Sequence, residues 1–261
     1  MFVILNGQVL ADESARISPY DKGFLLGDGF FTTLLAKEGK LEYFDAHLKR
    51  LKQSAKIFSL PEPSFEIQSH VLKILDLNQL KKDLAAIRIT ITRGISERGL
   101  ANLEKTSPTI LITAQSYKRP TSPLKMCISS IKRDKTPPLC HIKHLGYQAS
   151  ILARLEASEK GYEDALMLNS SNNLVCSTSG NLFLISRGEI STPPLNDGAL
   201  PGIMREKIIQ QHKNIKIRSL TIEDIENADS AFITNSLVGI QMISALEKRE
   251  LDTKININLP A

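Results

Sequence analysis

The segment His141-Ile142-Lys143-His144-Leu145-Gly146-Tyr147 places a single lysine directly before an alanine- and leucine-rich stretch. The periodicity of that stretch predicts a helix over residues 147–160, with Leu152, Leu155 and Ala157 on one face. An amine that is withdrawn from water loses part of its charge, and it then acts as a nucleophile and carries protons. Lys143 is therefore a candidate for a Schiff base with a carbonyl cofactor, although most lysines are simply solvated.

The size and composition of the chain are those of an ordinary globular protein. It has 261 residues, 42% hydrophobic and 23% charged, which is enough for one large domain or two small ones. The hydrophobic runs are too short for a membrane span, and the N-terminal residues lack the features of a signal peptide. Three scattered cysteines (Cys127, Cys140 and Cys176) do not suggest a disulfide framework. We therefore expect a cytoplasmic protein with no membrane partner.

The net charge of +5 is distributed in short clusters along the chain. No basic stripe is interleaved with aromatic residues, tryptophan is absent, and aromatic residues make up only 5% of the sequence. A nucleic-acid partner is therefore not expected. A modest basic excess suits an enzyme that binds a small anionic substrate.

The order of predicted elements divides the chain in two. Residues 1–115 predict strands, then helices, then strands, as in an α+β domain. Residues 125–261 begin a second pattern, and we expect them to form a C-terminal α/β domain that carries Lys143. Residues 116–124 have the composition of a linker. The pattern predicts an α+β protein of two domains with a cofactor cleft between them.

Specific elements follow from local signals. Helices are predicted over 45–58, after a cap at Ser64, over 147–160, over 202–212, and after Thr221 with Asp224 in a capping box. Strands are predicted at 2–5, 8–11, 30–37, 41–44, 85–93, 108–115, 125–131, 164–169, 181–186, 189–192, 230–235 and 245–251.

Three segments have the chemistry of anion binding. Gly202 stands at the start of a helix, where the amides of Ile203 and Met204 and the helix dipole favour a phosphate. The polar turn at Asn235 and Ser236 follows an apolar strand. Arg50 lies on the helix predicted over 45–58 and offers a fork of donors. Each of these also has an ordinary explanation, as a helix start, a turn or a solvated arginine.

Other segments are candidates for substrate binding. Arg93 and Arg98 bracket a glycine-containing loop that follows a strand, and such a loop suits recognition of carboxylates, although a solvated loop is the simpler explanation. Gly27-Asp28-Gly29 predicts a tight turn with a close approach to another group. Cys140, His141 and His144 lack a second ligand pair at a usual spacing, so we expect no metal site.

Taken in order, these segments resemble the fold-type IV pyridoxal-phosphate enzymes, which include branched-chain and D-amino-acid aminotransferases and 4-amino-4-deoxychorismate lyase. The resemblance covers nearly the whole chain. Tyr20 to Gly29 is similar to the family's Asp-Arg-Gly…Gly-Asp-Gly signature, and Ala46 to Leu51 is similar to its His-x-x-Arg-Leu helix. Ile142 to Leu145 is similar to its Schiff-base lysine motif. The remaining segments that carry the resemblance are Asn181 to Phe183, Pro201 to Arg205 and Thr234 to Ser236.

The resemblance implies a cofactor, an assembly and a set of site residues. The cofactor would be pyridoxal 5'-phosphate, with Lys143 as its Schiff-base partner and Arg50 on its phosphate. The family is typically a homodimer in which both subunits shape the site. The residues that the resemblance assigns to the cofactor are Arg50, Lys143, Tyr147, Cys176, Ile203, Met204, Asn235 and Ser236.

Within the family, details favour a lyase. Aminotransferases usually carry glutamate after the phenylalanine of the Gly-Asp-Gly-x-Phe motif, whereas Thr32-Thr33 resembles the lyase. The chain departs from the family at Gly146, where asparagine is usual, and at Cys176, where a glutamate normally pairs with the pyridine nitrogen. That carboxylate keeps the ring protonated and electron-withdrawing, and a neutral thiol does not.

The leading hypothesis is therefore elimination of pyruvate from 4-amino-4-deoxychorismate, giving 4-aminobenzoate for folate synthesis. Lys143 would take the proton from the carbon that bears the amine. Arg93 or Arg98 would hold a substrate carboxylate, and Thr32 or Thr33 would assist the leaving oxygen. Two alternatives stay open: an aminotransferase of branched-chain or D-amino acids, and a catalytically degenerate ligand-binding protein on the same fold.

Overall fold

The computed structural model describes residues 1–100, 103 and 107–254, and it divides into two compact units. Unit 1 is Met1–Arg119 together with Lys143–Gly146, and unit 2 is Pro120–Ile142 together with Tyr147–Ala261. The first boundary lies inside the expected linker. The lysine segment, which we expected in the C-terminal domain, belongs instead to unit 1, because its backbone is hydrogen-bonded to the first long strand of that unit.

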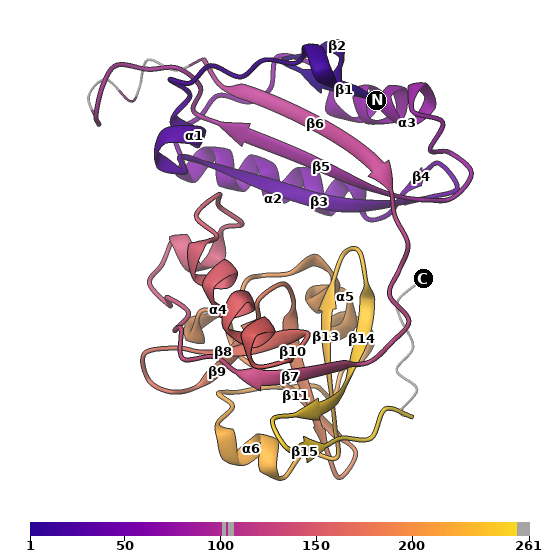
Figure 1. The fold of residues 1–261 in the computed structure, drawn as a ribbon, viewed down its shortest axis with the longest axis vertical. Helices are drawn as coiled ribbons and strands as arrows, with labels where there is room; N and C mark the ends of the chain where they lie inside the picture. The colour runs from indigo at the N-terminus through magenta and orange to yellow at the C-terminus, as the bar shows by residue number, and fades with distance from the viewer. Residues whose placement is uncertain (101–102, 104–106, 255–261) are drawn as a thin grey trace. The chain divides into compact units, whose positions relative to one another are not determined.

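Within its described residues, unit 1 contains a six-stranded antiparallel sheet in the order β2-β1-β6-β5-β3-β4 (Figure 1). Its strands are β1 (Phe2–Leu5), β2 (Gln8–Ala11), β3 (Gly29–Lys37), β4 (Lys40–Leu41), β5 (Leu84–Thr92) and β6 (Thr109–Ser116). Its helices are η1 (Asp12–Ser14), α1 (Lys22–Leu26), α2 (Phe44–Ile57) and α3 (Ile67–Leu77). The predicted hairpin of β1 and β2 is confirmed, with positive φ angles of 51° and 80° at Asn6 and Gly7.

Helix α2 runs along β3 (Figure 1) and buries the side chains of His47, Leu51 and Ala55. Successive side chains of a strand point to opposite faces, so Phe30 and Thr32 contact α2 or its end while Phe31 and Thr33 lie on the other face. This alternation gives the sheet a face that α2 covers and an opposite face, here called the open face, which carries Phe31, Thr33 and Arg88.

The start of α3 differs from the prediction. Its N-cap is Glu66, whose carboxylate accepts hydrogen bonds from the amides of Gln68 and Ser69. The predicted cap at Ser64 is therefore wrong. Glu66 also places a negative charge at the positive end of the helix dipole.

In the part of unit 2 that the structure describes, a nine-stranded sheet closes on itself, because β9 pairs with both β8 and β10. The strands are β7 (Leu124–Ile128), β8 (Asp164–Leu168), β9 (Leu174–Ser177), β10 (Asn181–Ser186), β11 (Glu189–Thr192), β12 (Lys216–Ile217), β13 (Ser230–Asn235), β14 (Gly239–Leu246) and β15 (Arg249–Glu250). The helices are η2 (Leu139–His141), α4 (Gln148–Glu159), η3 (Leu195–Asp197), α5 (Ile203–Gln211) and α6 (Ile222–Glu226).

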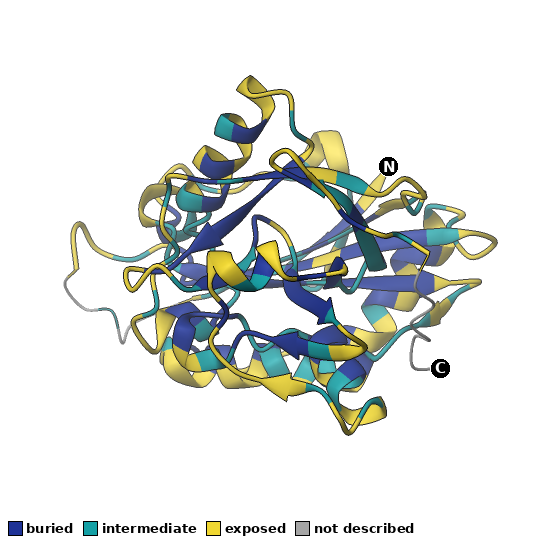
Figure 2. Ribbon diagram, turned by 90° about the horizontal axis from the view of Figure 1, so that it is seen from below, coloured by how far each residue is buried: buried dark blue, intermediate teal, exposed yellow. Residues whose placement is uncertain are grey.

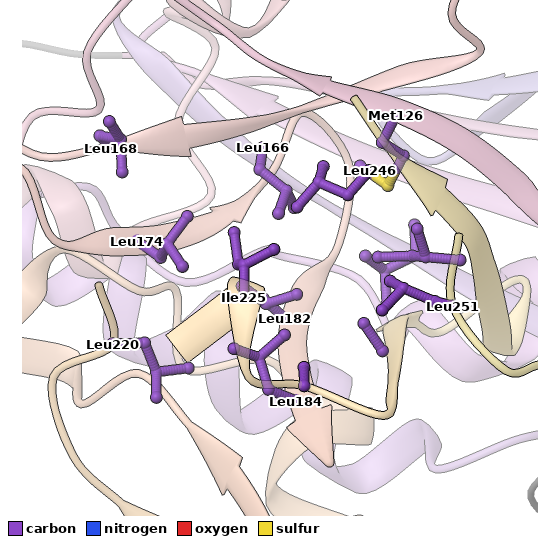
Figure 3. Packing of buried hydrophobic residues seen from close by; sticks show 14 residues of the cluster. Met126, Leu166, Leu168, Leu174, Leu182, Leu184, Leu220, Ile225, Leu246 and Leu251 are labelled. Carbon is purple, nitrogen blue, oxygen red and sulfur yellow. The ribbon is translucent and has the colours of Figure 1, made fainter. Parts of the chain in front are cut away.

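Leucine and isoleucine side chains from this barrel and from α6 form the main core of unit 2 (Figure 3). Leu182 and Met126 are fully buried there. Truncation of such a leucine to alanine typically costs about 2–5 kcal/mol of stability. Figure 2 shows that buried residues concentrate in the strands while exposed residues dominate the turns.

The predicted helix over 147–160 forms as α4, and one predicted strand of unit 2 is misplaced. Of the three residues named on one face of α4, Ala157 is buried, and Leu152 and Leu155 are more than half exposed. The last long strand is β14, which begins at Gly239, whereas the sequence pattern placed it at 245–251. The capping box of Thr221 and Asp224 on α6 is confirmed.

Candidate functional site

The lysine segment extends the sheet of unit 1. The amide of Phe31 donates to the carbonyl of Lys143 at 2.9 Å, and the amide of Leu145 donates to the carbonyl of Gly29 at 3.0 Å. These bonds pair the segment with β3 at the end that β4 does not cover. The backbone of Lys143 is therefore fixed by a strand more than a hundred residues earlier in the chain.

The amine of Lys143 lies over an aromatic ring. Its Nζ is 4.7 Å from the centre of the Phe31 ring, and the guanidinium carbon of Arg88 is 3.6 Å from the same centre. An aromatic face attracts cations, so Phe31 holds both positive groups near the open face of the sheet. Lys143 is half-buried, as a group that must meet a ligand should be.

Arg88 was missed by sequence analysis. It is exposed in the middle of β5, opposite Thr33 in the register, and its Nε donates to the hydroxyl of Thr90 at 3.0 Å. The available signal was a lone arginine within the alternating run Ile87-Arg88-Ile89, which places a full charge on the face that helices do not cover.

On the helix-covered face, Thr32, His47 and Arg50 meet. The Thr32 hydroxyl lies 2.7 Å from Nδ1 of His47 and accepts a short hydrogen bond from Nη2 of Arg50. Burial, followed by the positive charges of Arg50 and Lys143, lowers the pKa of His47 to about 3. His47 is therefore neutral at physiological pH, which suits its place beside two cations.

The two threonines named as candidates occupy different surroundings. Thr32 has no exposed surface, and its hydroxyl is bonded to His47 and Arg50. Thr33 lies on the opposite face of β3 and is half-buried. Only Thr33 is placed to contact a small molecule on the open face.

Arg93 is buried and is bonded within the protein. Its guanidinium pairs with both carboxylate oxygens of Asp28 and donates to the carbonyls of Phe58 and Leu103. The pairing explains the Gly27-Asp28-Gly29 motif, because the turn brings the Asp28 carboxylate to the Arg93 guanidinium. A role of Arg93 in holding a substrate carboxylate is not what this geometry supports, because Asp28 already neutralises its charge.

Arg98 lies in the loop that Arg93 helps to hold, and it is exposed. Lys22, which is buried, donates from Nζ to the carbonyls of Glu97 and Gly99 on either side of it. The loop is thus anchored from inside by two cations, while Arg98 points its charge to the surface.

In unit 2, the candidate anion-binding segment is the start of α5. Gly202 is the N-cap, and in the described structure no side chain caps this helix. A Cβ atom at Gly202 would lie 2.1 Å from Oδ1 of Asn181, so a larger residue there would displace the Asn181 amide, which donates to the carbonyl of Leu200. The amides of Ile203 and Met204 lie in the first turn of this helix, and the side chains of both residues are buried. Such amides favour an anion.

The other candidates of unit 2 lie near the ends of strands or, for Tyr147, at the start of a helix. Asn235 ends β13, and its side chain shapes the next turn by accepting from the amides of Leu237 and Val238 and donating to the carbonyl of Ser179. Ser236 follows in that turn and is half-buried. Cys176 lies on β9 opposite Met167 and Asn181, and Tyr147 is the N-cap of α4.

Two further observations concern the described residues alone. They contain no cluster of three or more histidine, cysteine, aspartate or glutamate side chains that could hold a metal ion. None of their helices combines the length and the apolar character that a bilayer span requires.

Comparison with known proteins gives consistent matches. The family described as Amino-transferase class IV matches residues 29–246. A relative from Methanocaldococcus jannaschii with a provisional assignment as a branched-chain-amino-acid aminotransferase is 31% identical, over 97% of this chain and 91% of its own. The aminodeoxychorismate lyase of Bacillus subtilis is 28% identical, over 94% of this chain and 87% of its own. The crystal structure of a branched-chain aminotransferase from Thermoproteus uzoniensis with norvaline superposes with a TM-score of 0.90 at 27% identity, covering 98% of this chain and 90% of that one.

Proposed function

Because the chain belongs to the class IV aminotransferase family, whose members use pyridoxal phosphate, we propose that it is a 4-amino-4-deoxychorismate lyase. The reaction would release pyruvate and give 4-aminobenzoate, a precursor of folate. The lyases of Bacillus subtilis and Vibrio harveyi, at 28% and 27% identity, support the choice.

Each unit has groups that suit the cofactor. Unit 1 has an amine at Lys143 and a guanidinium at Arg50, and the amine can react with an aldehyde while the guanidinium can bind a phosphate. Unit 2 has the first-turn amides of α5 at Ile203 and Met204, which also favour a phosphate. We assign the further cofactor contacts to Tyr147, Cys176, Asn235 and Ser236.

The residues of this chain would perform the elimination in simple steps. When bound, pyridoxal phosphate withdraws electrons from the substrate carbon that carries the amine. The Lys143 amine removes the proton from that carbon, and the bond between the ring and the enolpyruvyl oxygen breaks. The leaving group takes up a proton to become pyruvate, and the ring becomes aromatic. Phe31 beneath the amine excludes water from one side of Lys143.

The substrate carries two carboxylates, and the open face of the unit 1 sheet has charges to match. Arg88 lies over Phe31 beside Lys143 and is exposed, so we propose that it binds one carboxylate. Arg98 stays a candidate for the other. Thr33, opposite Arg88 in the register, is the candidate to assist the leaving oxygen.

Cys176 is the observation that carries the choice of a lyase. In the family this position holds the glutamate that keeps the cofactor ring protonated, and a thiol supplies no comparable negative charge. Transamination depends on a strong electron sink, because the cofactor has to store the electron pair. Elimination depends on it less, because formation of an aromatic ring drives the reaction forward.

An aminotransferase of branched-chain amino acids is the second candidate. The Methanocaldococcus jannaschii relative at 31% identity and the Thermoproteus uzoniensis structure at 27% favour it. It would use the same lysine to move a proton between two carbons of the substrate and cofactor, and it would need a keto-acid acceptor.

A homodimer is the proposed assembly. Apolar side chains of α1 and its surroundings are exposed on unit 1, and a stripe of α4 is exposed on unit 2. They are Tyr20, Phe24, Leu25, Leu26, Ile95 and Leu100, and Ile151, Leu152 and Leu155. A monomer would leave both of these groups of large apolar side chains in water, and we propose that a second copy of the chain covers them.

The deciding experiment uses the purified protein loaded with pyridoxal phosphate. It is incubated with 4-amino-4-deoxychorismate, and 4-aminobenzoate and pyruvate are followed together. In parallel, a panel of branched-chain and D-amino acids is tested with 2-oxoglutarate or pyruvate as acceptor. Equal release of both products, with slow transfer to the keto acids, supports the lyase. Rapid transamination without 4-aminobenzoate refutes it, and failure of both reactions favours a degenerate binding protein.

A further inference from the structure

Thr32, His47 and Arg50 form a connected group on the helix-covered side of β3. His47 and Arg50 are one turn apart on α2, so their side chains leave the same side of the helix. Thr32 reaches them from β3, and it is fully buried. The oxygen of its hydroxyl contacts both partners.

The protons of this group can be assigned from its chemistry. A guanidinium only donates, so the Thr32 oxygen must accept from Arg50. The hydroxyl has one proton of its own, and the acceptor at hand is Nδ1 of His47 at 2.7 Å. His47 must then carry its proton on Nε2, which is buried and has no hydrogen-bond partner within the described chain. The direction of donation runs from Arg50 to Thr32 to His47.

A neutral imidazole is a condition of this arrangement. A protonated ring would donate from both nitrogens, and the Thr32 hydroxyl would lose its acceptor. The charges that face His47 are both positive, from Arg50 on α2 and from Lys143. These charges and burial lower the pKa of His47 to about 3, so the ring stays neutral across the physiological range.

We propose that Thr32 and His47 are positioning residues, which we call the Thr32–His47 relay, and that they fix the Arg50 guanidinium for the phosphate of the cofactor. The inference rests on the proposed function, in which Arg50 binds that phosphate. It gives Thr32 a task other than contact with the substrate, in keeping with its complete burial.

The physical benefit lies in the flexibility of arginine. Its long side chain loses rotamer entropy when it is held in one conformation. If the relay already holds the Arg50 side chain in place, less of that entropy is lost when the ligand binds. A guanidinium has five N–H donors, so one bond to Thr32 is compatible with a bidentate contact to phosphate.

Comparison of two vitamers isolates this effect. Pyridoxal phosphate and pyridoxal share the ring and the aldehyde, and they differ only in the phosphate. Cofactor-free protein is titrated with each, and the ratio of the two dissociation constants is measured by absorbance. The variants are Thr32→Val, which removes the hydroxyl at nearly constant shape, and Thr32→Ser, which keeps it. The matched control is Thr192→Val, which removes another fully buried hydroxyl, bonded to the Leu182 carbonyl at 2.7 Å.

The expected result is a loss confined to the phosphate. Thr32→Val should bind pyridoxal phosphate about tenfold more weakly and pyridoxal unchanged, because one charge-assisted hydrogen bond is lost. Thr32→Ser and Thr192→Val should keep the ratio of the wild type. If Thr32→Val keeps that ratio, or if Thr32→Ser loses it, the relay is refuted. A wild type that does not prefer the phosphorylated vitamer would instead refute the proposed function.

A second measurement needs no variant of Thr32. The nitrogen chemical shifts of His47 in wild-type protein labelled with ¹⁵N-histidine report which nitrogen carries the proton, and His47→Gln identifies its signals. The relay requires a neutral ring protonated on Nε2 at pH 7. A ring protonated on Nδ1, or on both nitrogens, would overturn the proposal even if Thr32→Val failed to fold.

Discussion

The carbonyl of Lys143 accepts a hydrogen bond from the amide of Phe31 at 2.9 Å, and the amine of the same lysine lies 4.7 Å from the Phe31 ring. A single residue of β3 therefore contacts both the backbone and the side chain of the candidate nucleophile. The backbone bond does not depend on the side chain of residue 143. A substitution of Lys143 can therefore remove the amine and leave the backbone hydrogen bond to Phe31 in place.

Replacement of Lys143 by alanine should abolish catalysis and leave the fold intact. Loss of the base should lower the rate of 4-aminobenzoate release by roughly 10³-fold or more. Thermal unfolding of the cofactor-free variant should stay close to the wild type, because the carbonyl bond to Phe31 is retained. A variant that unfolds at a much lower temperature would show that the side chain itself supports the structure.

Replacement of Cys176 by glutamate should change the balance of reactions. A carboxylate at this position would strengthen the cofactor as an electron sink, so transamination of ordinary amino acids should rise in Cys176→Glu. Cys176→Gln, which has the same shape without the charge, is the control. If the wild type already transaminates faster than it releases 4-aminobenzoate, the argument from Cys176 is wrong.

Replacement of Arg88 should affect substrate binding. Arg88→Ala removes the exposed guanidinium above Phe31, and the KM for the dicarboxylate substrate should rise about tenfold or more. Arg88→Lys should recover part of that loss, since it keeps the charge without the fork of donors. An unchanged KM, with kcat reduced, would assign Arg88 to packing on the ring instead.

The neutral state of His47 should make stability depend on pH. The folded-state pKa of about 3 lies below the ordinary value of about 6.5, so the unfolded chain binds a proton that the folded chain does not. Stability should therefore fall as the pH drops below about 6.5, by up to about 1.4 kcal/mol per pH unit. Urea unfolding of the cofactor-free protein between pH 7 and 5 measures this, and His47→Gln should have a flatter profile. Parallel profiles would contradict the assignment.

The exposed apolar residues of α1 should mediate self-association. Phe24 is 78% exposed and Leu25 is 51% exposed. If a second copy covers them, the double variant Phe24→Asp and Leu25→Asp should sediment as a monomer at concentrations where the wild type is dimeric. A wild type that sediments as a monomer would rule out the proposed assembly. Lys37→Asp, on an exposed position of β3, is a control for the added charge.

Local patterns predicted most of the individual elements. The strands at 181–186, 189–192 and 230–235 lie at the positions expected, because apolar runs there are bounded by clear turn residues. The cap of α6 was predictable because both of its partners lie within one turn. Sequence patterns of this kind report contacts between near neighbours in the chain.

What the sequence pattern missed depends on distant contacts. Lys143 belongs to unit 1 because its backbone pairs with β3. Arg88 on β5 is a candidate because its guanidinium lies over the ring of Phe31 on the neighbouring strand β3. Periodicity placed Leu152 and Leu155 on one face of α4, but it cannot distinguish a face that packs inside the chain from one that is exposed, as these two leucines are. Arg93 looked like a substrate ligand until its pairing with Asp28 was visible.

The chain passes from unit 1 to unit 2 at Pro120, returns to unit 1 for Lys143–Gly146, and leaves it again at Tyr147. A fragment that ended at Arg119 would lack the amine of Lys143, and the remaining fragment would carry that amine without the strand that fixes its backbone. Under the proposed function, neither half alone would hold a working site. Exchange of either half between relatives would then preserve activity only if β3 and Lys143–Gly146 still pair.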